Sequence, residues 1–108
     1  MKRLFVNVVM VFDGVPEPNG MLCDVMVANN GSYEVNKMVF KQKDLETKEE
    51  SWVVFPEKHY RFRLEVMKDT LEAEIFKAQT DPNYAQESQI YEKILNDTTK
   101  PMNFQDGH

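Results

Sequence analysis

The stretch LFVNVVMVF, residues 4–12, decides the fold of this chain. Four of its nine residues are valine and only Asn7 is polar, a composition that favours a strand over a helix. Side chains alternate along a strand, and apart from Asn7 both alternating sets are apolar. One set is Leu4, Val6, Val8, Met10 and Phe12, and the other includes Phe5, Val9 and Val11. The stretch therefore predicts a strand that is covered on both faces.

Length and composition predict a single soluble domain. The chain has 108 residues, of which 42% are hydrophobic and 29% are charged, as is ordinary for a globular protein. The one cysteine, Cys23, excludes an internal disulfide, which is usual for proteins of the reducing cytoplasm. No stretch approaches the roughly 20 apolar residues of a membrane span. We expect one globular domain over residues 1–96, a polar C-terminal tail over residues 97–108 and a cytoplasmic location.

Turn signals and alternating apolar residues predict four further strands. An Asn-Asn-Gly turn at residues 29–31 joins strands over residues 21–28 and 32–42 as a hairpin. A short strand follows at residues 52–55 and ends at Pro56. Residues 58–67 alternate regularly, which predicts a half-buried antiparallel strand. Its inward side chains are Tyr60, Phe62, Leu64 and Val66, and its outward side chains are His59, Arg61, Arg63 and Glu65.

The last third of the chain predicts helices. Residues 70–79 fit either a helix or a strand, and their Leu, Glu, Ala and Lys residues favour the helix. A second helix is predicted from the capping residue Asp81, which Pro82 follows, to about Asn96. The expected fold is α+β, an antiparallel sheet of about five strands with two C-terminal helices on one face. There the inward residues of 58–67 would meet Ile90, Tyr91, Ile94 and Leu95. If residues 70–79 form a strand instead, the alternative is a mainly β sandwich with one C-terminal helix.

Few side chains are suited to catalysis or to metal binding. His59 is the one histidine before the last residue, and its alternation with Arg61 predicts a solvated position. Cys23 alternates with Val25 and Val27, which favours a place in the core over a role as nucleophile. The sequence contains neither a glycine-rich phosphate loop nor a calcium loop. We therefore predict that the protein is not an enzyme and binds no metal and no organic cofactor.

Residues 58–63, KHYRFR, interleave basic and aromatic side chains. Strand readers of single-stranded nucleic acid need the rings and the basic groups on one exposed face, whereas alternation separates them here. The net charge of -5 also disfavours non-specific binding to DNA or to an anionic membrane. We expect His59, Arg61 and Arg63 to bind a protein partner. Single-stranded nucleic acid binding through the strand 58–63 is the alternative.

The second apolar face of residues 4–12 predicts self-association. Two short helices would cover only one face of the predicted sheet, so that Phe5, Val9 and Val11 would form an exposed apolar patch. Such a patch is typical of a homo-oligomer, most simply a dimer. The expected function is that of a small binding or inhibitory accessory protein that acts through protein contacts, as many small phage proteins do. A protein that binds or sequesters a small ligand is the alternative from another class.

Overall fold

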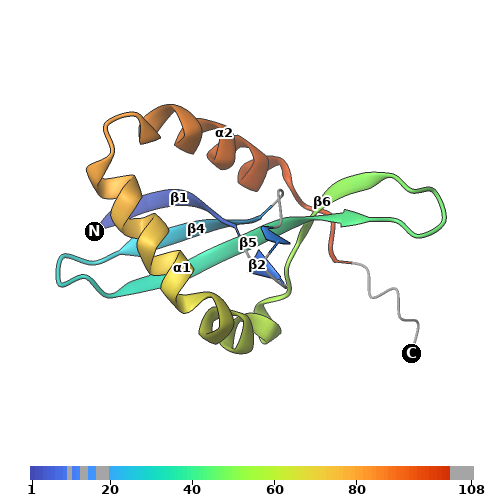
Figure 1. The fold of residues 1–108 in the computed structure, drawn as a ribbon, viewed down its shortest axis with the longest axis horizontal. Coiled ribbons are helices and arrows are strands. Elements are labelled where there is room, and N and C mark those ends of the chain that lie inside the picture. Colours follow the sequence, from blue (N-terminus) through green and yellow to red (C-terminus); the bar gives the residue numbers. More distant parts are fainter. Residues whose placement is uncertain (10, 13–14, 17–19, 103–108) are drawn as a thin grey trace.

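The computed structural model describes residues 1–9, 11–12, 15–16 and 20–102, without the side chains of residues 11, 12, 15 and 16. Its main sheet has the strand order β1-β4-β5-β6, and all neighbours are antiparallel (Figure 1). These strands are β1 (Lys2–Val8), β4 (Met21–Val27), β5 (Tyr33–Lys43) and β6 (Glu50–Val54). A separate two-stranded ladder pairs β2 (Val11–Phe12) with β3 (Val15–Pro16). After β6 come the 3-10 helix η1 (Glu57–His59) and the helices α1 (Tyr60–Thr80) and α2 (Tyr84–Asp97).

The predicted α+β class is confirmed, with an antiparallel sheet and two C-terminal helices. The main sheet has four strands rather than about five because residues 58–67, predicted as a strand, are helical. Leu64, Met67 and Leu71 follow the three-and-four spacing of one helix face, and all three pack into the core. The helix predicted over residues 70–79 is the C-terminal part of α1, so the β-sandwich alternative is wrong.

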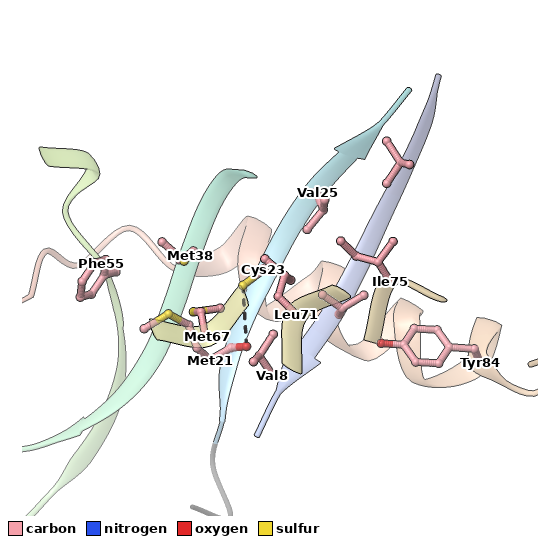
Figure 2. Packing of buried hydrophobic residues seen from close by; sticks show 12 residues of the cluster. Val8, Met21, Cys23, Val25, Met38, Phe55, Met67, Leu71, Ile75 and Tyr84 are labelled. Atoms are coloured by element: carbon pink, nitrogen blue, oxygen red, sulfur yellow. Dashed lines mark hydrogen bonds between the residues drawn. The ribbon is translucent and has the colours of Figure 1, made fainter. Parts of the chain in front are cut away.

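α1 covers one face of the sheet. Its buried residues Met67, Leu71 and Ile75 belong to the cluster that Figure 2 shows from close by. The strands contribute to that cluster Val6, Val8, Met21, Cys23, Val25, Val27 and Met38. At the start of α1 the hydroxyl of Tyr60 accepts a hydrogen bond of 3.2 Å from the amide of Met38. This contact ties the first turn of the helix to β5.

The C-terminal half of α2 covers the opposite face. Leu95 is buried against Phe5, Leu22 and Val39, whose side chains alternate with those that face α1. Figure 1 shows α1 crossing in front of the strands while α2 runs beside β1. The two helices were expected on one face of the sheet, but the C-terminal half of α2 packs on the face opposite α1. The sheet lies between α1 and the C-terminal half of α2, while Tyr84, the first residue of α2, joins the cluster on the α1 side. The chain itself therefore covers both faces of its first strand.

One charged side chain ties α2 to the sheet, and another links two strands of the sheet. Lys37 of β5 donates from Nζ to the carbonyl oxygens of Leu95, at 2.6 Å, and of Thr98, at 2.8 Å. An ammonium group suits a helix C-terminus, where carbonyl groups lack partners within the helix. Arg3 of β1 forms a bidentate ion pair with the buried carboxylate of Asp24 on β4, with donor–acceptor distances of 2.7 and 3.0 Å. Neither helix of the described chain is long and apolar enough to cross a membrane.

Candidate interaction surface

Cys23 lies in the core, as its alternation with valine predicts. Its side chain is fully buried, and the thiol approaches the carbonyl oxygen of Met21 at 3.9 Å. Burial raises the pKa of the Cys23 thiol well above its usual range, and the nearby carboxylate of Asp24 raises it further. A thiol that resists deprotonation in this way is a poor nucleophile and a poor metal ligand.

Three of the basic and aromatic residues of 58–63 lie around the buried ring of Phe55. Tyr60 stacks on this ring with 6.1 Å between centroids, and His59 meets it edge-on at 6.3 Å. The guanidinium carbon of Arg63 lies 5.5 Å from the centroid of the same ring, at the distance of a cation–π contact. His59 and Arg63 therefore cover the ring of Phe55 at the end of the hydrophobic core that lies next to η1.

Arg61 is separated from the other two basic residues. Residues two apart on an α-helix differ by about 200° in direction, so Arg61 and Arg63 point to different sides of α1. The prediction that His59, Arg61 and Arg63 share one outward face of a strand is wrong, because these residues lie on η1 and α1. Their role in binding a protein partner stays a prediction. His59 and Arg61 are exposed, whereas Arg63 is half-buried.

Two of the three residues predicted to form the oligomer interface are not fully exposed. Phe5 is only 8% exposed because α2 packs over it, and Val9 is half-buried. The side chain of Val11 lies outside the described residues. The apolar face at Phe5 is not open, because α2 packs over it. Self-association through Phe5, Val9 and Val11 stays a prediction.

An exposed apolar row runs along the outward side of α1. Phe62, Val66 and Phe76 are 73%, 52% and 67% exposed, and Ala73 between them is exposed as well. Their spacing of four, seven and three residues places them on one side of a helix, directly opposite Met67, Leu71 and Ile75. We call Phe62, Val66, Ala73 and Phe76 the outer row. Asp69 shares this side of the helix at its midpoint.

A hollow of about 260 Å³ adjoins the outer row at Phe76. It lies between α1 and the hairpin end of β4 and β5, and its lining residues are Gly31, Tyr33, Glu72, Ile75, Phe76 and Gln79. The hydroxyl of Tyr33 donates a hydrogen bond of 2.8 Å to Oε2 of Glu72. Desolvation, together with this hydrogen bond to a carboxylate, raises the pKa of Tyr33 to about 12. The bond fixes the C-terminal half of α1 against the hairpin and keeps the hollow in shape.

Within the described residues, no group of three or more His, Cys, Asp or Glu side chains is placed to hold a metal ion. Comparison of the chain with protein-family models, curated proteins and solved structures finds no match. The outer row is thus the feature of the described surface that most needs a functional explanation.

Sequence reasoning missed the outer row because Phe62 and Val66 were assigned to the inward side of a strand. The contacts expected between these two residues and Ile90 do not form, since all three are more than half exposed. A signal for the row was present. Phe62, Val66, Ala73 and Phe76 fit one helical side while Leu64, Met67, Leu71 and Ile75 fit the other, which indicates a helix with two apolar sides.

Proposed function

We propose that this protein acts by binding another protein molecule through the outer row of α1, as a small cytoplasmic binding or inhibitory accessory protein without catalysis of its own. The observation that carries the proposal is the exposure of Phe62, Val66 and Phe76 on a helix whose opposite side already fills the core. The fold does not need these side chains. Exposed apolar groups gathered along one element are typical of protein interfaces.

The chemistry of the row supports protein binding. Aromatic rings are the side chains most enriched among the anchors of protein interfaces, where they enter pockets and exclude water. Burying a Phe or Val side chain fully is worth about 1.5–3 kcal/mol, so the three most exposed members of the row contribute substantially to the free energy that specific binding needs. The row is also held rigidly, because Tyr60 ties the start of α1 to β5 and Glu72 ties its C-terminal half to Tyr33.

Photo-crosslinking in cells of the source organism tests this proposal. A photoreactive phenylalanine analogue replaces Val66 in one variant and Leu45, in the hairpin loop after β5, in a matched control. Leu45 is 63% exposed, so both positions present the probe to solvent. We expect covalent protein adducts from position 66 that far exceed those from position 45. Equal yields at both positions, or none, would contradict the proposal, and the mass of each adduct identifies the bound protein.

A further inference from the structure

We propose that the occupant of the outer row is a second copy of this chain, with the two α1 helices packed antiparallel about a two-fold axis that passes close to Asp69. This inference rests on the proposed function and names its partner. Three observations on α1 carry it: the placement of the two phenylalanines, the division of charge along the helix, and the size of the apolar surface.

The outer row is symmetric about its midpoint. Phe62 and Phe76 lie seven residues before and after Asp69, which corresponds to about 10 Å on each side at 1.5 Å per residue. A two-fold axis at Asp69 reverses the second helix, so that Phe62 of one copy lies opposite Phe76 of the other. The same operation brings Val66, three residues before Asp69, near Ala73, four residues after it, with an offset of about 1.5 Å, so that a larger side chain lies beside a smaller one.

The hollow beside Phe76 fits this arrangement. It borders the outer row at the position where the two-fold operation brings Phe62 of the second copy. The lining offers apolar surface from Ile75 and Phe76 and aromatic surface from Tyr33. An incoming ring would fill the hollow, and by symmetry the contact forms twice in the dimer. This is the self-complementary contact that an isologous interface needs.

Charge is divided along α1 in a way that favours the antiparallel direction. The N-terminal half carries the bases Arg61, Arg63 and Lys68 beside one acid, Glu65. The C-terminal half, beyond Asp69 at the axis, carries the acids Glu72 and Glu74 beside one base, Lys77. Antiparallel packing sets the basic half of each helix against the acidic half of the other, whereas parallel packing would set like charges together. Opposed helix dipoles favour the same direction.

The two-fold axis brings Asp69 of one copy close to Asp69 of the other, since this exposed residue lies on the side of the outer row at the axis. Lys68 lies about 100° around the helix from Asp69 and does not face the second copy. Within the described part of the chain, Asp69 forms no salt bridge. The two carboxylates therefore repel each other across the axis, and this repulsion weakens the dimer.

The apolar surface predicts a reversible dimer. A phenylalanine carries about 150–250 Å² of surface, so the exposed parts of Phe62 and Phe76 leave on the order of 250 Å² in water on each copy. Two copies with their flanking side chains reach the lower end of the range for specific complexes, where about 1,000 Å² in total is needed. A dimer of this size forms and separates with protein concentration.

Sedimentation of the purified chain between about 1 μM and about 1 mM tests the inference. We expect a monomer–dimer equilibrium in this range. Phe76→Ser should weaken dimerisation at least about a hundredfold, because it removes a ring from both ends of the interface. Leu45→Ser is the matched control, since Leu45 is as exposed as Phe76 but lies in the hairpin loop, and its dimerisation should equal that of the wild type.

A charge variant tests the register without relying on loss of binding. Asp69→Asn removes the like charges that meet at the axis, so it should strengthen self-association severalfold. Lys68→Gln is the matched control, because Lys68 is exposed but lies outside the outer row, and its dimerisation should equal that of the wild type.

Three outcomes would overturn the inference: a wild type that stays monomeric at about 1 mM, a Phe76→Ser variant that dimerises normally, or an Asp69→Asn variant that associates no more tightly than the wild type. The proposed function fails separately. If the wild type is monomeric but the probe at position 66 captures a different protein, the outer row binds proteins and only the second copy is wrong. If the probe at position 66 captures nothing beyond the control, the proposed function falls as well.

Discussion

The two helices use their apolar residues differently. α2 buries Tyr84 and Leu95 along one side and exposes mostly polar residues elsewhere, apart from Ile90. α1 buries Met67, Leu71 and Ile75 on one side and displays the outer row on the other. A helix that only packs on a sheet needs a single apolar side, as α2 shows. The second apolar side of α1 does not pack in the core, and its exposure is the basis for the proposed function.

The contrast between the two sides of α1 predicts the largest effect on stability. Leu71→Ala should lower the free energy of unfolding by about 2–5 kcal/mol, because the fully buried side chain leaves a cavity in the core. Phe76→Ala removes a larger side chain but should change stability by less than about 0.5 kcal/mol, since the ring lies in solvent. Urea unfolding at low protein concentration measures both. Equal losses would show that the two sides of α1 are not distinct.

The attachment of α2 predicts a smaller effect. Lys37→Met removes the ammonium group that binds two carbonyl oxygens at the end of α2, and should cost about 1.5–3 kcal/mol. Lys43→Met, in the exposed end of β5, is the control and should be nearly neutral. Hydrogen exchange of the last turn of α2 locates the loss. If both variants unfold at the same urea concentration as the wild type, Lys37 does not anchor the helix.

The flanks of α1 predict an effect of intermediate size. Arg63→Ala should cost about 1 kcal/mol, because it removes the guanidinium group over Phe55 and the packing of its aliphatic stem. Arg61→Ala should change stability little, since Arg61 points into solvent. Thermal unfolding of the two variants separates them. A larger loss for Arg61 would contradict the helical placement of these residues.

The smallest effect concerns the bond between Tyr33 and Glu72. The pKa of Tyr33 is raised to about 12 in the folded protein, above the ordinary value of a tyrosine near 10. The unfolded chain therefore loses this proton first as pH rises, so the contribution of Tyr33 to stability is complete below pH 10 and disappears between about pH 10 and 12. Tyr33→Phe should show a shallower loss of stability in that window. An unchanged slope in alkaline urea titrations would contradict the shifted pKa.

Much of the sheet was predictable because its strands have a simple pattern. The Asn29-Asn30-Gly31 turn and the stop at Pro56 each have one structural meaning, and the strands beside them lie close to where the sequence predicts them. The strand predicted over residues 4–12 is shorter than expected, because β1 ends at Val8 and Val11–Phe12 pair with β3 in the separate ladder. α2 was predictable because its apolar residues form one side, although Asp81 ends α1 and α2 begins at Tyr84, three residues after the predicted cap.

The N-terminal half of α1 was not predictable in the same way. A helix with apolar residues on two opposite sides loses the single-sided periodicity by which helices are identified. Over residues 60–66, this second side made every other residue apolar, the pattern of a half-buried strand. The misassignment then concealed the candidate site, because Phe62 and Val66 were placed in the core. The feature that misled the secondary-structure prediction is the same feature that we propose binds the second copy.

The most direct test follows the phenylalanine rings themselves. Incorporating para-fluorophenylalanine and recording fluorine NMR spectra during dilution reports the surroundings of each ring, with Phe5, Phe62 and Phe76 assigned by single Phe→Leu substitutions. We predict that the signals of Phe62 and Phe76 shift together with protein concentration, since each ring packs against the other in the dimer, while the buried Phe5 keeps its position. A shift at Phe5 with none at Phe62 and Phe76 would contradict the assignment of the interface to α1 and return it to the first strand.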